Sequence, residues 1–311
     1  MRGSRLIHRQ QSAVTARSID GYLQRVVTRL ESGHHHIHLG DAHGQGRGPG
    51  IHQLGGFSLY LSPVEINLGK RESVYDVAKN LERMVQGIMI RTFAHDIVER
   101  MAQYAAIPVI NGLTDYSHPC QAMADYLTML EVNGRLSGLK VAFVGDGNNV
   151  AHSLMFVGAQ VGAHVWVATP PGYEPLKNAL SWAQYRGAET GGTCTITTDP
   201  VEAVRDADVV YTDVWASMGQ EDEAGERRQH FLPYQVNAAL FSLAKPDAIF
   251  MHCLPAHRGD EVTDEVIDCP RSVVFQQAEN RLHVQKAIML ELMKLPVTET
   301  VISKAEELVH V

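Results

Sequence analysis

The feature that most constrains the fold is a repeated exchange between short apolar runs and longer amphipathic segments. The apolar runs have the length and composition of buried strands, and they occupy residues 57–61, 87–91, 108–111, 140–144, 165–169, 208–212 and 248–251. Segments of helical spacing lie between them, over 73–85, 96–104, 118–131 and from about 149 onward. Strands that alternate with helices in this way predict an α/β fold built from mostly parallel sheets flanked by helices.

The chain is long enough for about two domains, because it has 311 residues and 45% of them are hydrophobic. We predict one domain over 1–130 and a second over 131–285, with the helix at 118–131 linking them. The apolar segment 287–292 would start a closing helix, which we assign to 286–311. Each domain would carry its own sheet, and a cleft between the domains would hold the ligands.

The composition argues against several classes of protein. A formal net charge of −8 disfavours a nucleic-acid-binding surface. Four irregularly spaced cysteines without a CxxC pair suggest neither a zinc ribbon nor a disulfide scaffold, and they suit a reducing cytoplasm. No apolar run approaches the roughly 20 residues that span a membrane, and no signal sequence is indicated. We therefore expect a cytoplasmic protein without nucleic-acid or membrane partners.

Polar residues follow several of the predicted strands, at the sheet edge where α/β folds bind ligands. Arg91 ends the strand at 87–91, where its guanidinium suits a phosphate, although a charged strand end can also be simply solvated. Asp213 closes the strand at 208–212 and could hold an ammonium group or cap its own loop. Cys253 and Leu254 follow the strand at 248–251, and a free cysteine is most often an inert buried thiol.

The segment His118-Pro119-Cys120-Gln121 opens a helix. Pro119 suits a first helical turn, where free N–H groups and the helix dipole favour an anion. His118 could be a structural hydrogen-bonding residue, but its position beside Pro119 and the amide of Gln121 favours a binding role.

Two other patterns indicate no cofactor and no metal. The turn Gly145-Asp146-Gly147-Asn148-Asn149 follows a strand but lacks the third glycine of a dinucleotide fingerprint. The histidines between His34 and His43 are irregularly spaced and have no cysteine or carboxylate partners that would complete a metal site.

Three motifs together resemble those of the ornithine carbamoyltransferases, in the family's order: 118–121, 213–219 and 252–259. The resemblance runs from about Ile51 to the C-terminus. It implies a carbamoyl-phosphate side made of Asn67, Arg91, His118, Pro119, Cys120, Gln121 and Arg281. It implies an ornithine side made of Asn149, Asp213, Ser217, Met218, Cys253 and Leu254, with Asn148 capping the adjacent helix. His118, Arg91 and Cys253 would be the catalytic residues.

The same resemblance implies a reaction and an assembly. Neutral Nδ of ornithine would attack carbamoyl phosphate, without metal or covalent intermediate, and give citrulline and phosphate. The active site would lie at the interface of a homotrimer, with Asn67 reaching the neighbouring subunit and the last helix crossing back to the first domain. Two alternatives stay open: a sibling enzyme that uses aspartate, putrescine or an acylated ornithine, and a non-catalytic amino-acid binder.

The chain departs from the family at its N-terminus. The family's phosphate-binding Ser-Thr-Arg-Thr-Arg should occupy positions 40 to 44, where this chain has Gly-Asp-Ala-His-Gly. Codons for Asp-Ala-His, read one nucleotide later, can spell Thr-Arg-Thr at positions 41 to 43. We therefore hypothesise that residues 1–50 are a frameshifted translation, which makes an inactive or impaired homologue a further alternative. Asn67 also stands where the family usually has Gln.

Overall fold

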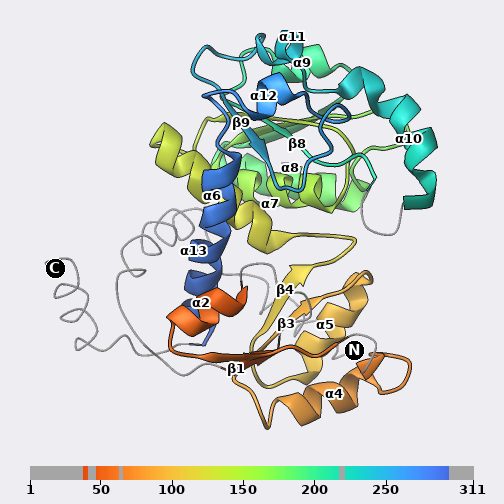
Figure 1. The fold of residues 1–311 in the computed structure, drawn as a ribbon, viewed down its shortest axis with the longest axis vertical. Coiled ribbons are helices and arrows are strands. Elements are labelled where there is room, and N and C mark those ends of the chain that lie inside the picture. Colours follow the sequence, from red (N-terminus) through yellow and green to blue (C-terminus); the bar gives the residue numbers. More distant parts are fainter. Residues whose placement is uncertain (1–37, 41–46, 63–65, 217–220, 294–311) are drawn as a thin grey trace, which may run out of the picture.

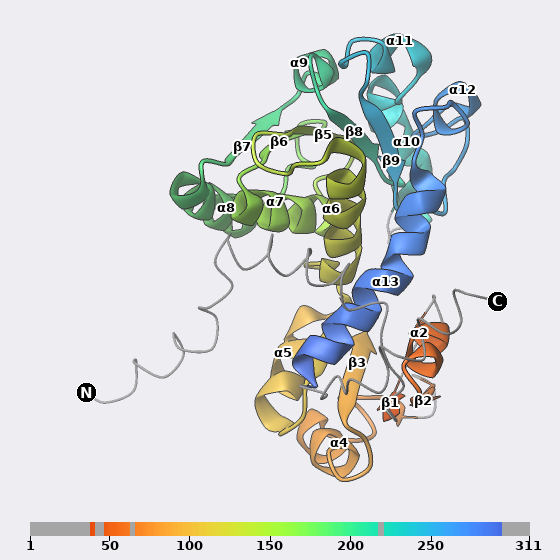
Figure 2. The ribbon, with the colours of Figure 1, turned by 90° about the vertical axis from the view of Figure 1, so that its left-hand side faces the viewer.

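The computed structural model describes residues 38–40, 47–62, 66–216 and 221–293. Within these residues two parallel sheets lie at opposite ends of the molecule, and helices flank each of them (Figures 1 and 2). The α/β fold class predicted from the alternation of apolar runs is therefore confirmed.

The first sheet has the order β2-β1-β3-β4, and all of its pairs are parallel. Its strands are β1 (His38–Gly40), β2 (Phe57–Leu59), β3 (Gly87–Arg91) and β4 (Val109–Leu113). Ile88 and Ile90 of β3 pack under α4 (Val74–Leu81) and α5 (His95–Tyr104), whereas Met89 faces the opposite side. This alternation is the two-residue period of a strand that is covered on both faces.

The second sheet has the order β7-β6-β5-β8-β9, again with parallel pairs. Its strands are β5 (Lys140–Val144), β6 (His164–Ala168), β7 (Thr193–Thr197), β8 (Val209–Thr212) and β9 (Ile249–His252). One face carries α6 (Pro119–Asn133), α7 (Asn149–Val161) and α8 (Lys177–Thr190). The other face carries α9 (Pro200–Val204), α11 (Ala238–Phe241) and α12 (Asp264–Ile267), and α10 (Ala224–Phe231) lies beside it.

The long helix α13 (Val274–Leu292) connects the two halves. It packs across α6 and extends from the β9 side of the molecule toward the first sheet (Figures 1 and 2), where it contacts α2 (Arg47–Gln53). Val284 belongs to the core of the second sheet, whereas Met289 and Leu290 belong to the core of the first. The expected closing helix therefore begins at Val274 and not near 287, because its first three turns are too polar to show an apolar period.

The glycine-rich stretch before Ile51, which has no apolar period, nevertheless forms β1 and α2 in its described parts. Tertiary packing explains α2: Ile51 and Leu54 are buried against the α13 side of the first sheet. A Cβ added at Gly50 would lie 3.3 Å from the side chains of Leu282 and Lys286, so a small residue suits this close approach. The frameshift hypothesis stays a prediction, as do the domain boundaries.

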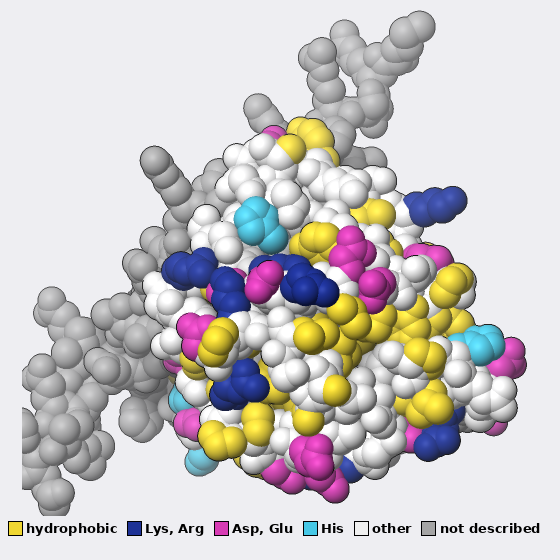
Figure 3. Space-filling view, turned by 90° about the horizontal axis from the view of Figure 1, so that it is seen from above, with side chains coloured by type: hydrophobic (Ala, Val, Ile, Leu, Met, Phe, Trp, Pro, Cys, Tyr) yellow, Lys and Arg dark blue, Asp and Glu magenta, His cyan; other side chains and the backbone are white. Residues whose placement is uncertain are grey.

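The outer surface near the second sheet mixes both signs of charge. On the face seen from that end, basic side chains lie among acidic ones (Figure 3). Among the described ion pairs, Arg228 pairs with Asp260, and Arg258 pairs with Asp264 and Asp268. No helix of the described residues is both long enough and apolar enough to cross a membrane.

Candidate active site

A cleft of about 370 Å³ opens between the two sheets, at the carboxyl ends of β3 and β4 on one side and of β5, β8 and β9 on the other. The crossovers from β5 and β8 leave the second sheet in opposite directions, which is the switch point where open α/β folds bind ligands. The cleft brings together eight of the residues singled out from sequence: Arg91, His118, Gln121, Asn149, Asp213, Cys253, Leu254 and Arg281.

His118 lies on the first-sheet side of the cleft as the N-cap residue of α6. The residue is buried, and its backbone N–H donates to Ser153 Oγ over 2.7 Å, which ties the start of α6 to α7. Arg91 from β3 and Arg281 from α13 line the same cleft. One imidazole, two guanidinium groups and a helix N-terminus thus border one space, which suits an anion.

Several residues singled out from sequence do not line this cleft. The Cys120 thiol points into the core of the first sheet and donates to the Asn111 carbonyl over 3.4 Å, and Pro119 borders a separate groove near α5 and α7. Asn67, with a positive φ of 46°, lines a neighbouring apolar cavity of about 330 Å³ that Arg91 also borders. Ser217 and Met218 lie outside the described residues.

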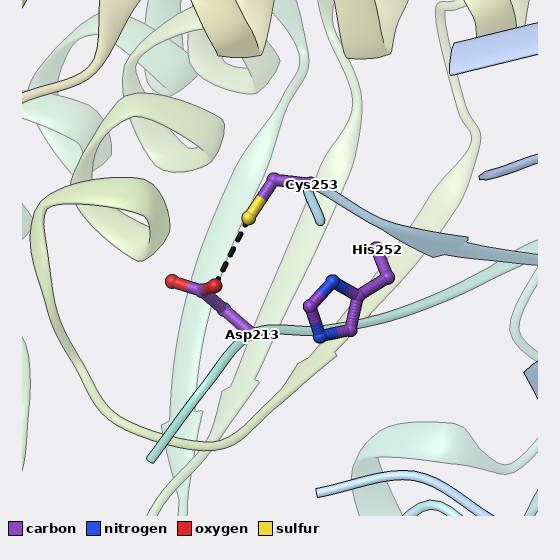
Figure 4. A group of neighbouring side chains, drawn as sticks. All are labelled: Asp213, His252 and Cys253. Atoms are coloured by element: carbon purple, nitrogen blue, oxygen red, sulfur yellow. Dashed lines mark hydrogen bonds between the residues drawn. The ribbon is translucent and has the colours of Figure 1, made fainter. Parts of the chain in front are cut away.

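Asp213 and Cys253 form the centre of the second-sheet side (Figure 4). Cys253 Sγ donates to Asp213 Oδ1 over 2.9 Å, and Asn148 Nδ2 donates to Asp213 Oδ2 over 3.0 Å. Burial raises the pKa of the Cys253 thiol well above its usual range, and the neighbouring Asp213 carboxylate raises it further. Cys253 is therefore a protonated hydrogen-bond donor at neutral pH, not a thiolate nucleophile.

The turn after β5 contributes two asparagines with different partners. Asn148 Oδ1 accepts the backbone N–H groups of Val150 and Ala151, so the predicted helix cap is confirmed. Asn149 Nδ2 donates to the Thr114 carbonyl over 2.6 Å, across to the end of β4. The two side chains fix the turn to both walls of the cleft.

Leu254 has a positive φ of 56°, which residues other than glycine rarely adopt. Its backbone N–H donates to His252 Nδ1 over 2.9 Å, so Nδ1 is the acceptor and Nε2 carries the proton. That Nε2 lies 3.2 Å from Glu261 Oε1, and both side chains are fully buried. A buried His–Glu pair thus holds the backbone that brings Cys253 and Leu254 to the cleft.

An ion pair between Asp146 and Arg227 was missed in the sequence. Arg227 Nη2 bonds Asp146 Oδ2, its Nε donates to the Trp215 carbonyl over 2.6 Å, and the guanidinium lies over the ring of Tyr173. Burial raises the pKa of Asp146 to about 6, although the Arg227 charge opposes that rise. Arg227 lies in a strongly charged segment that resembles a solvated helix, and no local signal reports a partner 81 residues away.

Asp213, His252 and Cys253 also place three possible metal-ligand atoms within 4.8 Å of one another. Each of these atoms already takes part in a hydrogen bond within the protein: the thiol with Asp213, and the two ring nitrogens of His252 with Leu254 and Glu261. The group is therefore satisfied as a hydrogen-bonded cluster.

Comparison with known proteins identifies the fold and the two halves. The family model "Aspartate/ornithine carbamoyltransferase, carbamoyl-P binding domain" matches residues 49–131, and the model of the Asp/Orn binding domain matches 137–292. The chain belongs to the aspartate/ornithine carbamoyltransferase family.

Relatives and solved structures agree with this membership. The ornithine carbamoyltransferase of Thermococcus kodakarensis is 62% identical over 244 residues, 78% of each chain, and that of Bacillus subtilis is 59% identical over 240 residues, 77% of this chain and 75% of the relative. The structure of the Pyrococcus furiosus ornithine carbamoyltransferase superposes with a TM-score of 0.85 at 50% identity, covering 90% of this chain and 94% of that one. The anabolic Campylobacter jejuni enzyme gives a TM-score of 0.85 at 31% identity, covering 90% and 96%.

Proposed function

We propose that this carbamoyltransferase transfers the carbamoyl group of carbamoyl phosphate to the δ-amino group of L-ornithine, giving L-citrulline and phosphate. One observation carries the proposal. An anion-binding set at the start of α6 and an amino-acid set around Asp213 and Cys253 border the same cleft. The names and identities of the relatives support ornithine as the acceptor.

The carbamoyl-phosphate side works through positioning and charge. Arg91, Arg281 and the free N–H groups at the start of α6 bind the phosphate oxygens. Cys120 contributes its backbone N–H, whereas Pro119, which has no N–H, fixes the first turn of the helix. His118 donates to the carbonyl oxygen as it gains negative charge, and Gln121 bonds the NH2 group. Preorganised donors of this kind stabilise an oxyanion in a site that excludes water.

The ornithine side presents the nucleophile. Asn149, Asp213, Ser217 and Met218 bind the α-amino and α-carboxylate groups, and Cys253 with the Leu254 backbone orients Nδ. Neutral Nδ forms the new N–C bond, and the C–O bond to phosphate breaks. The surplus proton of Nδ leaves on the departing phosphate, so no metal, cofactor or covalent enzyme intermediate takes part.

We further propose a cytoplasmic homotrimer. The four cysteines are free, which suits a reducing compartment. Asn67 lies outside the cleft of its own chain, and an active site at the subunit interface gives it a place beside a neighbour's carbamoyl phosphate. Sedimentation of the purified chain would test the assembly, and a monomer at micromolar concentration would contradict it.

The activity is tested by citrulline formation from ornithine and carbamoyl phosphate, with aspartate, putrescine and N-acetylornithine as alternative acceptors. Product formation with ornithine, and with none of the other three acceptors, supports the proposal. If only another acceptor is carbamoylated, that acceptor and not ornithine is the substrate. If ornithine binds independently of carbamoyl phosphate and no citrulline forms, the protein is a non-catalytic binder.

A second candidate is an impaired homologue that keeps the cleft but binds phosphate poorly. It rests on the absence of arginine from positions 40 to 44, where the family's phosphate motif would lie. Two lost charge-assisted contacts, each of roughly 1.5–3 kcal/mol, would lower binding or rate by about two to four orders of magnitude. Sequencing the gene in the alternative reading frame separates a genuine loss from a frameshift.

A further inference from the structure

The side-chain amide of Gln121 has one satisfied end and one unsatisfied end. Its Nε2 donates to Asp125 Oδ1, one turn further along α6, over 2.8 Å. Its Oε1 is buried and has no hydrogen-bond partner among the described residues, and Gln121 lines the cleft. Because buried polar atoms are nearly always paired, an unsatisfied oxygen beside a binding cleft points to a donor on the ligand.

The orientation of this amide follows from a chain of contacts that begins on β9. The backbone N–H of His252 can only donate, and it donates to Gln277 Oε1 over 3.0 Å. Gln277 must therefore turn its NH2 group the other way, where Nε2 lies 2.7 Å from Asp125 Oδ1.

Asp125 receives donors from three elements. Its Oδ1 accepts from Gln121 and Gln277, and its Oδ2 accepts from the Tyr211 hydroxyl over 3.2 Å. All four side chains are almost completely buried. Because Oδ1 already accepts the NH2 group of Gln277, it is an acceptor for Gln121 as well, so Gln121 can only face it with its own NH2 group, which leaves Oε1 for the cleft.

We propose that Asp125 is a positioning residue that holds the Gln121 amide oxygen toward the cleft, so that the site prefers an acyl phosphate bearing an NH2 group. This rests on the proposed function, which puts carbamoyl phosphate beside Gln121. This series of hydrogen bonds starts at His252, next to Cys253. It therefore connects the residue that would recognise the carbamoyl NH2 group to β9, the strand that leads to the ornithine-binding Cys253. Burial raises the pKa of Asp125 to about 7, against the lowering effect of its three donors, in keeping with a carboxyl group placed there for its contacts.

The test compares carbamoyl phosphate with acetyl phosphate, which replaces NH2 by a methyl group and keeps the phosphate. Calorimetric titration of the full chain gives both dissociation constants on one sample. We expect carbamoyl phosphate to bind about 3- to 10-fold more tightly, the value of one neutral hydrogen bond. Asp125→Leu should bring the ratio close to one with little change for acetyl phosphate. Asp125→Asn should keep the ratio, because its amide oxygen can take the Oδ1 position.

Thr128→Val is the matched control. Thr128 is buried on the same helix, accepts from Asn280 of α13 over 2.9 Å and donates to the Ala124 carbonyl, and neither of these hydrogen bonds involves Gln121. A ratio retained in the Thr128 variant and lost in Asp125→Leu separates orientation of the amide from general α6–α13 packing. Partial unfolding and the missing phosphate motif affect both ligands alike and cancel in the ratio.

A second measurement does not depend on the folding of Asp125→Leu. The side-chain NH2 signals of Gln121, assigned by their loss in Gln121→Met, should shift with pH near 7 in the unmodified chain and stay constant in Asp125→Asn. Among the described residues, the other titratable or charged groups around Asp125 are Tyr126, Tyr211, Cys253 and Arg281, and burial raises the pKa values of both tyrosines and of Cys253 well above the usual range.

The outcomes are distinct. An unchanged ratio in Asp125→Leu, Gln121 NH2 signals that are the same in Asp125→Asn as in the unmodified chain at every pH, or a ratio lost as fully in Asp125→Asn would each overturn the positioning role. If the unmodified chain binds neither acyl phosphate, the proposed function itself fails. Equal binding of the two by the unmodified chain would overturn the contact between Gln121 and the ligand.

Discussion

The strands of the second sheet are four or five residues long and pair in unbroken register, whereas β1 and β2 of the first sheet have three residues each. The second sheet also supplies its own site residues, and Asp213 bonds both Asn148 and Cys253. On the first-sheet side, most of the site comes from helices: His118 and Gln121 from α6 and Arg281 from α13. These two helices pack on each other and reach both sheets.

The carbamoyl side of the cleft therefore depends on the second half for much of its geometry. If residues 1–50 are altered as the frameshift hypothesis holds, phosphate ligands would be lost, but the start of α6 would stay fixed through the bond between His118 and Ser153. This predicts a protein whose cleft has the right shape but lacks part of the positive charge that would bind the phosphate.

The largest expected effect comes from replacing positions 40 to 44 by Ser-Thr-Arg-Thr-Arg. If charge is what the first half lacks, kcat/KM for carbamoyl phosphate should rise by about two to four orders of magnitude, from two charge-assisted contacts. Initial rates of citrulline formation measure it. The control carries Ser-Thr-Gln-Thr-Gln at the same positions, and an equal rise in the control would show that shape was limiting.

The next effect concerns the second half. Arg227→Leu leaves the buried Asp146 carboxylate without its partner and should lower the free energy of unfolding by about 3–5 kcal/mol. The neighbouring Arg228 has a side chain that is 57% exposed and pairs with Asp260. Arg228→Leu should therefore change the free energy of unfolding by less than about 1 kcal/mol. Urea unfolding of both variants measures the difference. Similar values would mean that the Asp146 pair is solvated and does not stabilise the second half.

Sequence patterns predicted the strands that are apolar along their whole length. β5, β8 and β9 were found because every second residue of such buried strands is as apolar as its neighbours. β7 was missed because its sequence, Thr-Cys-Thr-Ile-Thr, is mostly polar and lies at an edge of the sheet, partly exposed.

The candidate site was predictable to the extent that its residues follow strands or open a helix. Arg91, His118 and Asp213 stand at such positions, and the structure brings them to one cleft. Arg227 and Asp125 could not be found, because their importance comes from partners on distant elements: Asp146, and Gln277 with Tyr211. A charged residue within a helical segment carries no mark of whether tertiary packing will bury it.

A third test asks whether the α6 side of the cleft does chemistry. His118→Asn removes the imidazole but keeps the backbone bond to Ser153, and kcat should fall by about 10²–10³, as for loss of an oxyanion donor. Citrulline formation is measured in the chain with the restored phosphate motif, where rates are highest. His164→Asn, a β6 histidine bonded to Thr193 and remote from the cleft, should leave kcat unchanged. A normal kcat for His118→Asn would mean that the imidazole at the start of α6 does not stabilise the carbonyl oxygen of carbamoyl phosphate.

The smallest effect is a dependence of stability on pH at the junction between the halves. The pKa of Asp125 is about 7 in the folded chain against an ordinary 3.8, so between these values only the folded state holds the proton. Its stabilising contribution is complete below about pH 4 and is lost as pH rises through 7, by at most about 1.4 kcal/mol per pH unit. Asp146, whose pKa is raised to about 6, acts in the same direction, so the difference between the unmodified chain and Asp125→Asn isolates the contribution of Asp125.

Urea unfolding at pH 5, 6, 7 and 8 should show the unmodified chain losing stability relative to Asp125→Asn, with the difference levelling off above 7. Parallel curves would mean that Asp125 is ionised throughout, and that its three donors outweigh the cost of burying the carboxylate between the two halves.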